Sequence, residues 1–136
     1  IFETRGNQDC HVILRGGKLP NYAATDVDAA CTLLKSAGLR EQVMVDVSHA
    51  NSSKQHQKQI EVAANVAQQI AAGDKRITGL MVESHLEEGR QDIVPGQALK
   101  VGVSVTDACI SMAQTVPVLQ GLAAAVRSRR VAAQAT

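Results

Sequence analysis

The chain has 136 residues, 45% hydrophobic and 20% charged, which is long enough for one domain with a core and too apolar for a disordered segment. A net charge of +1, with Phe2 and Tyr22 as the aromatic residues and no Trp, leaves neither an electrostatic nor a stacking case for binding nucleic acid. No apolar run reaches the roughly 18 residues that span a bilayer, and no signal peptide is recognisable, so we expect no membrane partner.

Three short apolar runs, rich in β-branched residues, predict strands that are buried on both faces. They occupy positions 11–14, 42–47 and 77–82. A helix is predicted after the first strand, with Thr25 or Asp26 as its N-cap and Gly38 as its stop. A second helix is predicted from near Ser52 to Gly73, because apolar residues recur there at helical spacing.

A last helix is predicted to begin near Thr115, with Pro117 in its first turn. It ends in the basic run 127–130, whose cations suit a helix C-terminus. Between the third strand and this helix, segment 87–105 is a long loop, which is typical of functional or mobile segments. The alternation of strands and helices predicts an α/β fold with parallel strands and helices outside.

The three cysteines, Cys10, Cys31 and Cys109, are far apart and form no CxxC pair. So sparse and odd a set fits a reducing cytosol better than a disulfide framework, and we expect a cytoplasmic protein. Cys109 is either a small buried hydrophobic residue or a reactive thiol, and the former is commoner.

Each predicted strand ends in polar residues. They are Arg15 after the first strand, Asp46, Ser48 and His49 after the second, and Glu83, Ser84 and His85 after the third. Since parallel strands point their carboxyl ends the same way, these groups converge on one face, which holds the active site in α/β proteins. A single one of them can equally be a residue that merely caps a loop.

His49 and Glu83 together suggest a metal site, because an imidazole and a carboxylate suit Mn, Fe, Co or Zn. Asp107, which follows the long loop, is a third candidate ligand. Its alternative role is a helix N-cap. No short ligand motif such as HExxH is present, so the residue types alone indicate a metal only weakly.

Arg15 is followed by two glycines, a combination that could let a guanidinium and the backbone approach a phosphate or carboxylate. The alternative is that Gly16-Gly17 is simply a turn. Two further histidines have plainer interpretations. His56 lies in a polar run that looks like a solvated helix face, and His85 is a minor candidate for contact with the site.

Several stretches together resemble the type I 3-deoxy-D-arabino-heptulosonate 7-phosphate (DAHP) synthases, and the resemblance runs almost from end to end. The matching stretches are GNQDCHVILRGGK at 6–18, PNY at 20–22, VMVDVSHANSSKQ at 43–55, GLMVESHL at 79–86 and SVTDACI at 104–110. Their order and spacing agree with the family, and they are highly specific as a set.

The resemblance implies condensation of phosphoenolpyruvate with erythrose 4-phosphate, the first step of the shikimate pathway, by a metal-dependent homo-oligomer. It implies that His49, Glu83 and Asp107 are metal ligands for Mn, Fe or Co. His49 and Asp107 would be catalytic, and Arg15 would bind the phosphoenolpyruvate phosphate. Asp107 would also help to orient the sugar, while the metal polarises its aldehyde.

The resemblance also implies that residues 1–136 are a C-terminal fragment of a single (β/α)₈ TIM-barrel domain, covering about strands six to eight. A fourth ligand, a Cys, and the loop for erythrose 4-phosphate would lie in the part not covered. Met112, Arg90 and Val103 depart from the family pattern near the site. We therefore expect the isolated chain to be inactive and to associate through its open strand edges. The alternatives are a non-catalytic half-barrel module that needs a partner chain, or another metal-dependent aldolase or lyase on the same barrel.

Overall fold

A computed structural model describes residues 1–7 and 9–134 and contains a three-stranded parallel sheet in the order β1-β2-β3. The strands are β1 (Val12–Leu14), β2 (Val43–Asp46) and β3 (Ile77–Met81). Each falls within its predicted run. The prediction of an α/β fold with parallel strands is therefore confirmed.

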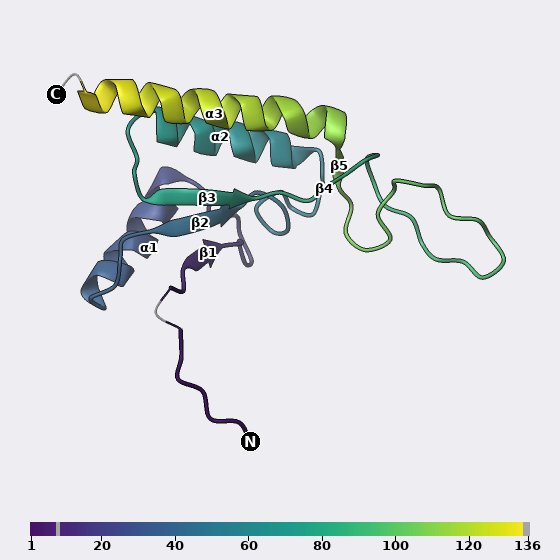
Figure 1. Cartoon of the computed structure of the whole chain (residues 1–136), viewed down its shortest axis with the longest axis horizontal. Helices are drawn as coiled ribbons and strands as arrows, with labels where there is room; N and C mark the ends of the chain where they lie inside the picture. Colours follow the sequence, from purple (N-terminus) through teal and green to yellow (C-terminus); the bar gives the residue numbers. More distant parts are fainter. Residues whose placement is uncertain (8, 135–136) are drawn as a thin grey trace.

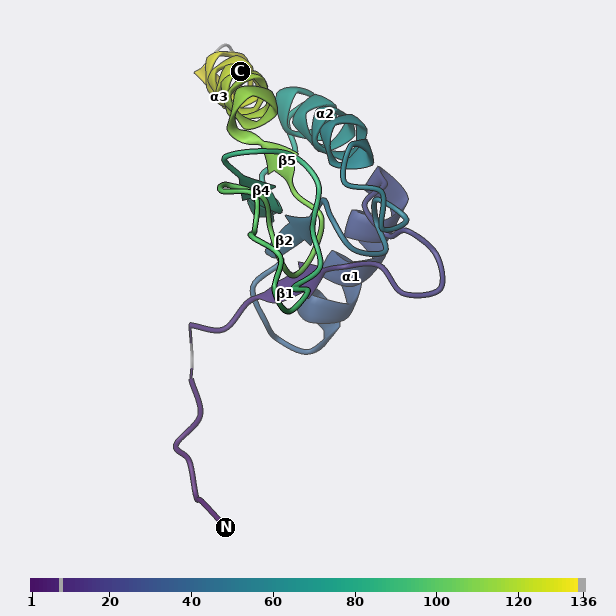
Figure 2. The ribbon, with the colours of Figure 1, turned by 90° about the vertical axis from the view of Figure 1, so that its right-hand side faces the viewer.

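Three helices, α1 (Ala24–Ser36), α2 (Lys58–Ala71) and α3 (Met112–Gln134), accompany the sheet. Figure 2 shows them as an arc on one side of the strands, and α2 and α3 lie side by side along their length (Figure 1). None of the helices in the described part of the chain is long and apolar enough to cross a membrane.

The start of α1 differs from the prediction. Its N-cap is Ala23, and Asp26 stands in the first turn, where its carboxylate accepts the backbone N–H of Ala23 at 3.0 Å. Thr25 and Asp26 are therefore not N-caps. Gly38 lies just beyond the helix with φ of +70°, as its role as a stop requires.

The predicted start of α2 near Ser52 is wrong. Residues 49–54 and 56–57 form turns, and the helix begins only at Lys58. Ser53 and Lys54 have φ of 53° and 59°, and this left-handed backbone cannot continue a right-handed helix. The apolar face is as predicted, because Val62, Ala63, Val66 and Ile70 are buried.

The predicted limits of α3 are also wrong at both ends. The helix begins at Met112 rather than Thr115, so Pro117 lies inside it and not in the first turn. It continues past the basic run 127–130 to Gln134, and its last turn has no basic residue. The cations of that run therefore do not sit at the helix C-terminus.

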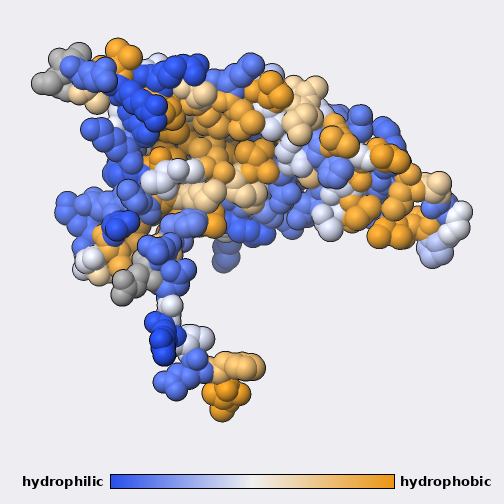
Figure 3. All heavy atoms as spheres, viewed as in Figure 1, coloured by the Kyte–Doolittle hydropathy of each residue, from blue (hydrophilic) through white to orange (hydrophobic). Residues whose placement is uncertain are grey.

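The core lies between β2 and the helices. Its fully buried side chains include Val43 and Val45 of β2, Val27 of α1 and Val66 of α2. The edge strand β1 does not share this burial, since Val12 and Ile13 are 41% and 48% exposed. In β3, Thr78 is exposed as well. The prediction that every strand is buried on both faces is therefore wrong for β1 and β3. Apolar side chains also gather on the surface between β3 and α3 (Figure 3).

Beyond β3 the chain forms an arm, residues 86–109, which projects from the body (Figure 1). Its base is held where β4 (Ser84–His85) pairs in parallel with β5 (Ile110–Ser111). Gly89 and Cys109 bridge the two sides of the arm. Within it, the side chain of Gln91 binds the backbone N–H and C=O of Lys100. The long loop predicted at 87–105 therefore forms most of this arm and is held by hydrogen bonds of its own.

Candidate metal centre

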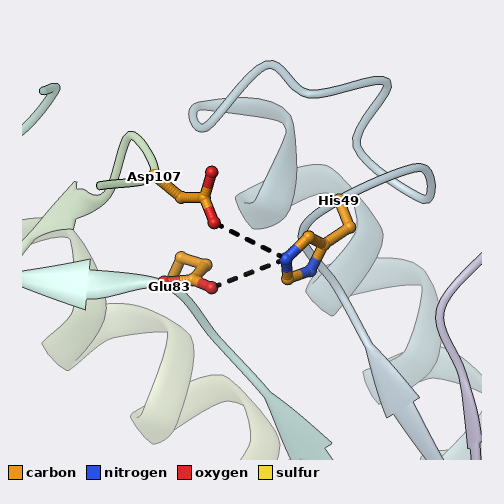
Figure 4. A group of neighbouring side chains, drawn as sticks. All are labelled: His49, Glu83 and Asp107. Carbon is orange, nitrogen blue, oxygen red and sulfur yellow. Dashed lines mark ion pairs between the residues drawn. The ribbon is translucent and has the colours of Figure 1, made fainter.

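Three side chains from separate parts of the chain meet at the carboxyl end of the sheet: His49, Glu83 and Asp107 (Figure 4). His49 follows β2, Glu83 follows β3, and Asp107 comes from the returning side of the arm. His49 Nε2 lies 3.8 Å from Glu83 Oε1 and 3.8 Å from Asp107 Oδ2. One donor atom from each residue lies within 4.8 Å of the other two.

These separations fit a shared cation better than direct pairing. At 3.8 Å, neither carboxylate is within hydrogen-bonding distance of His49 Nε2. Atoms that ligate one ion at about 2.0–2.2 Å lie roughly 3 to 4 Å apart. One imidazole nitrogen and two carboxylate oxygens form a donor set suited to Mn, Fe, Co or Zn. The described residues can therefore supply three ligands to one divalent ion.

The imidazole of His49 is held from behind by Asp46, whose Oδ2 lies 2.7 Å from His49 Nδ1. Asp46 ends β2 and is 1% exposed, and its Oδ1 accepts the backbone N–H of Ser48 at 2.8 Å. The backbone of His49 has φ of 45°, a conformation uncommon outside glycine. This ring is therefore placed by its turn and by a buried carboxylate together.

Glu83 is held through its backbone by Gln59, a residue that the sequence pattern did not single out. Gln59 Nε2 donates to the carbonyl of Glu83 at 3.1 Å, and Gln59 Oε1 accepts the N–H of Glu83 at 2.8 Å. Gln59 is 1% exposed although it stands in a polar run. One sequence signal could have identified Gln59. At helical spacing it lies on the same face as the apolar residues Val62 and Ala63, which are buried.

Asp107 is the most exposed of the three, with 71% of its side chain accessible. Its alternative role as a helix N-cap is wrong, because the next helix begins at Met112. The two sides of the arm are joined next to Asp107, because Arg90 Nε donates to the carbonyl of Thr106 at 3.1 Å. The arm therefore places the Asp107 carboxylate next to His49 in the candidate metal centre.

A cavity of about 200 Å³ opens beside two of the candidate ligands, His49 and Asp107. It is lined by Arg15, Ser48, His49, Lys54, His56, Asp107 and Ala108. Arg15, 61% exposed, keeps its guanidinium within reach of this space, and its Nε lies 4.0 Å from Asp46 Oδ2. Of the four residues predicted from the sequence, Arg15, His49 and Asp107 line this cavity, and Glu83 lies 3.8 Å from His49.

The backbone N–H groups of the two glycines after Arg15 are both hydrogen-bonded within the chain. Gly16 N–H donates to Asn21 Oδ1 at 2.7 Å, and Gly17 N–H donates to the carbonyl of Leu19 at 3.0 Å. Gly16 has φ of +74°, and a Cβ there would lie 2.8 Å from the Cβ of Ala50. Both N–H groups therefore have partners within the chain, which favours the interpretation of Gly16-Gly17 as a turn.

Asn51 is a second buried residue whose importance the sequence did not reveal. Its amide nitrogen donates to the carbonyls of Leu14 and Asp46, at 3.0 and 2.7 Å. Its Oδ1 accepts the N–H of Asn21 at 2.7 Å. Asn51 thereby joins the ends of β1 and β2 and fixes the loop that follows Arg15.

His56, His85 and Cys109 are not among the three candidate ligands. His56 is not on a solvated helix face: it lies in the turns before α2, and its Nε2 is buried without a hydrogen-bond partner among the described residues. His85 is exposed, its Nδ1 accepts the N–H of Leu86, and it lines neither the cavity nor the metal group. Burial raises the pKa of the Cys109 thiol, which disfavours a reactive thiolate.

Comparison with known proteins gives a consistent result. Residues 2–120 match the model of the DAHP synthetase I family. The Phe-sensitive phospho-2-dehydro-3-deoxyheptonate aldolase of Escherichia coli K12 is 56% identical over 130 residues, which cover 96% of this chain and 37% of that protein. The tyrosine-inhibited enzyme of Schizosaccharomyces pombe is 54% identical over 135 residues, covering 96% and 36%.

A solved structure agrees with these relatives. Phospho-2-dehydro-3-deoxyheptonate aldolase from Francisella tularensis superposes with a TM-score of 0.88 and 46% sequence identity, covering 94% of this chain and 37% of that one. The chain thus spans little more than a third of the length of the relatives it matches.

Proposed function

Because the chain belongs to the DAHP synthetase I family, we propose that it supplies the metal-binding edge of a DAHP synthase active site. The reaction is the condensation of phosphoenolpyruvate with erythrose 4-phosphate to give DAHP and phosphate. The observation that carries this proposal is the meeting of His49, Glu83 and Asp107 beside a cavity lined by Arg15.

Each residue has a role that its chemistry suits. His49, Glu83 and Asp107 would hold a divalent cation, with Mn, Fe or Co as the candidates. When bound, the cation supplies Lewis-acid polarisation of the aldehyde of erythrose 4-phosphate. Arg15 binds the phosphate of phosphoenolpyruvate, since a guanidinium can donate two parallel hydrogen bonds to phosphate oxygens. Asp107, exposed at the cavity, orients a hydroxyl of the sugar and is catalytic together with His49.

For the whole fold we propose a (β/α)₈ barrel in which β1, β2 and β3 are about the sixth to eighth strands. The parallel sheet with an arc of helices on one side supports this arrangement. In such barrels the active site lies at the carboxyl ends of the strands, which is where the three candidate ligands gather. The three cysteines are free, which fits a reducing cytosol as the site of action.

A second candidate function is a half-barrel module that is completed by a partner chain or a second copy. The observation that favours it is the pair of open edges: β1 and β3 each pair with β2 alone in the three-stranded sheet. Exposed Val12 and Ile13 on β1 add apolar surface beside one edge. Such edges promote association, so we propose that the chain forms homo-oligomers.

A chimera tests the catalytic proposal. In the E. coli Phe-sensitive relative, the 130 matched residues are replaced by those of this chain, and phosphate release is measured with both substrates and Mn²⁺. We expect turnover, its loss in His49→Ala, Glu83→Ala and Asp107→Ala, and its retention in His85→Ala. A folded but inactive chimera would contradict the proposal.

The 136-residue chain alone is assayed in parallel. We expect no turnover, because three strands leave the site open on two sides. Clear phosphate release by the purified chain would show that this expectation is wrong. A mass measurement in solution distinguishes the assembly module, which predicts defined oligomers, from a chain that stays monomeric.

A further inference from the structure

Asp46 lies behind the candidate metal centre and has no ligand role of its own. Its side chain is 1% exposed, and it stands at the carboxyl end of β2 between Arg15 and His49. We propose that Asp46 is a positioning residue that holds His49 in the one tautomer able to ligate a metal through Nε2. This inference rests on the metal site proposed above.

The two ring nitrogens of His49 face different groups. Nδ1 lies 2.7 Å from Asp46 Oδ2, whereas Nε2 faces Glu83 and Asp107, each at 3.8 Å. A neutral imidazole carries one N–H, and an ionised carboxylate can only accept. The N–H therefore belongs on Nδ1, where Asp46 accepts it, and the lone pair of Nε2 points toward the two carboxylates. This is the form in which histidine binds metals.

The position of the Asp46 carboxylate is itself set by neighbours. Its Oδ1 accepts the Ser48 N–H at 2.8 Å, and its backbone carbonyl accepts from Asn51 Nδ2 at 2.7 Å. These two hydrogen bonds restrain the carboxylate in its position beside the ring. The oxygen left after the Ser48 hydrogen bond is the one that faces His49.

The backbone of His49 supports the same view. Its φ of 45° places the residue in the left-handed region, which is costly for a residue with a side chain. The turn is held by the His49 carbonyl, which accepts the Lys54 N–H at 2.7 Å. The ring of a residue held in this conformation can be presented to Asp46 on one side and to the ligand carboxylates on the other.

A purely structural role is the alternative. Asp46 would then serve only to hold the turn through Ser48, and the tautomer of His49 would not depend on it. Asp46→Asn separates the two roles. If its Oδ1 keeps the Ser48 hydrogen bond, its NH₂ group must face Nδ1 of His49. An amide donor there requires an acceptor, so the proton moves to Nε2, where it competes with metal ligation.

The test uses the full chain and two measurements. Long-range ¹H–¹⁵N NMR of the metal-free protein, above the ordinary titration range of histidine, reports which nitrogen of His49 carries the proton. We expect Nδ1–H in the unmodified chain and Nε2–H in Asp46→Asn. Mn²⁺ affinity, measured by the EPR signal of the free ion, should fall about 10- to 100-fold in Asp46→Asn.

Asp74→Asn is the matched control. Asp74 is also a largely buried carboxylate with hydrogen-bond partners, but it precedes β3 and therefore lies at the opposite end of that strand from Glu83. Its removal should leave Mn²⁺ affinity and the His49 tautomer unchanged.

The outcomes separate the two proposals. Nε2–H in the unmodified chain overturns the role of Asp46, and this measurement holds even if Asp46→Asn does not fold. Mn²⁺ binding that survives Asp46→Asn unchanged also overturns it and leaves the metal site intact. Absence of Mn²⁺ binding by the unmodified chain overturns the proposed metal site, and this inference with it.

Discussion

The side-chain amide of Gln59 is hydrogen-bonded to both backbone polar groups of Glu83, which stands 24 residues further along the chain. Gln59 lies in the first turn of α2, and Glu83 follows β3. The Glu83 carbonyl also accepts the N–H of Ile110 in β5 at 3.0 Å. The backbone of this candidate ligand is therefore fastened to a helix on one side and to the base of the arm on the other.

Replacing Gln59 by Leu should destabilise the protein and weaken the site. The Glu83 N–H loses its partner, and an unsatisfied buried group costs about 1–3 kcal/mol. Urea unfolding measures this loss, and Mn²⁺ titration shows whether Glu83 has moved. Gln68→Leu, on an exposed position of α2, is the control and should change neither quantity. Equal stability of the two variants would contradict the role of Gln59.

Replacing His49 by Ala should weaken Mn²⁺ binding by the chain, because the nitrogen ligand of the candidate group is lost. The loss should exceed the roughly 10- to 100-fold that removal of an outer hydrogen-bond partner costs. His85→Ala removes an exposed imidazole outside the metal group and should bind Mn²⁺ as the unmodified chain does. Mn²⁺ binding that survives His49→Ala would mean that the ion is held elsewhere. Equal loss of binding in both variants would point to loss of the fold, which circular dichroism detects.

Replacing Gly16 by Ala should destabilise the loop that carries Arg15. The new Cβ would lie 2.8 Å from Ala50 Cβ, at a φ of +74° that alone costs about 1–3 kcal/mol for a residue with a side chain. Gly17→Ala is a close control, because its Cβ meets no heavy atom of the described residues within 4 Å and its φ is not in the left-handed range. The free energy of unfolding should fall for the first variant and hardly change for the second.

The ion pair between Asp74 and Arg76 should make the free energy of unfolding depend on pH in the acid range. The hydrogen bond from the Arg76 side chain, at 2.7 Å, lowers the pKa of Asp74. Since the folded-state pKa lies below the unfolded value of about 3.9, this contribution is complete above that value and is lost as the pH falls through the folded pKa.

Unfolding by urea at pH 7 and pH 3 checks this dependence. Asp74→Asn should be less stable than the unmodified chain at pH 7, and the difference should shrink at pH 3. Glu61→Gln, which removes an exposed carboxylate of α2, should show no such convergence. A difference for Asp74→Asn that stays constant with pH would mean that the carboxylate charge is not what stabilises the pair.

Much of the fold could be predicted because the relevant signals are local. β-branched apolar runs mark the three strands, and the helical period marks the buried face of α2. The errors fall where distant contacts intervene. The sequence predicts a helix from near Ser52, yet the chain forms turns up to Lys58, and Asn51 at their start binds the carbonyl of Leu14, 37 residues away. The start of α3 at Met112 is likewise joined to the pairing of β5 with β4.

The sequence by itself determined which residues could take part in the site: Arg15, His49, Glu83 and Asp107 each follow a strand or the long loop, within motifs that resemble one family. Only the tertiary structure decided how they are held. The orientation of His49 depends on a buried carboxylate, and the position of Glu83 depends on an amide 24 residues away. A polar residue in a sequence shows no sign of such a role, because its hydrogen-bond partners are set by packing and not by neighbouring residues.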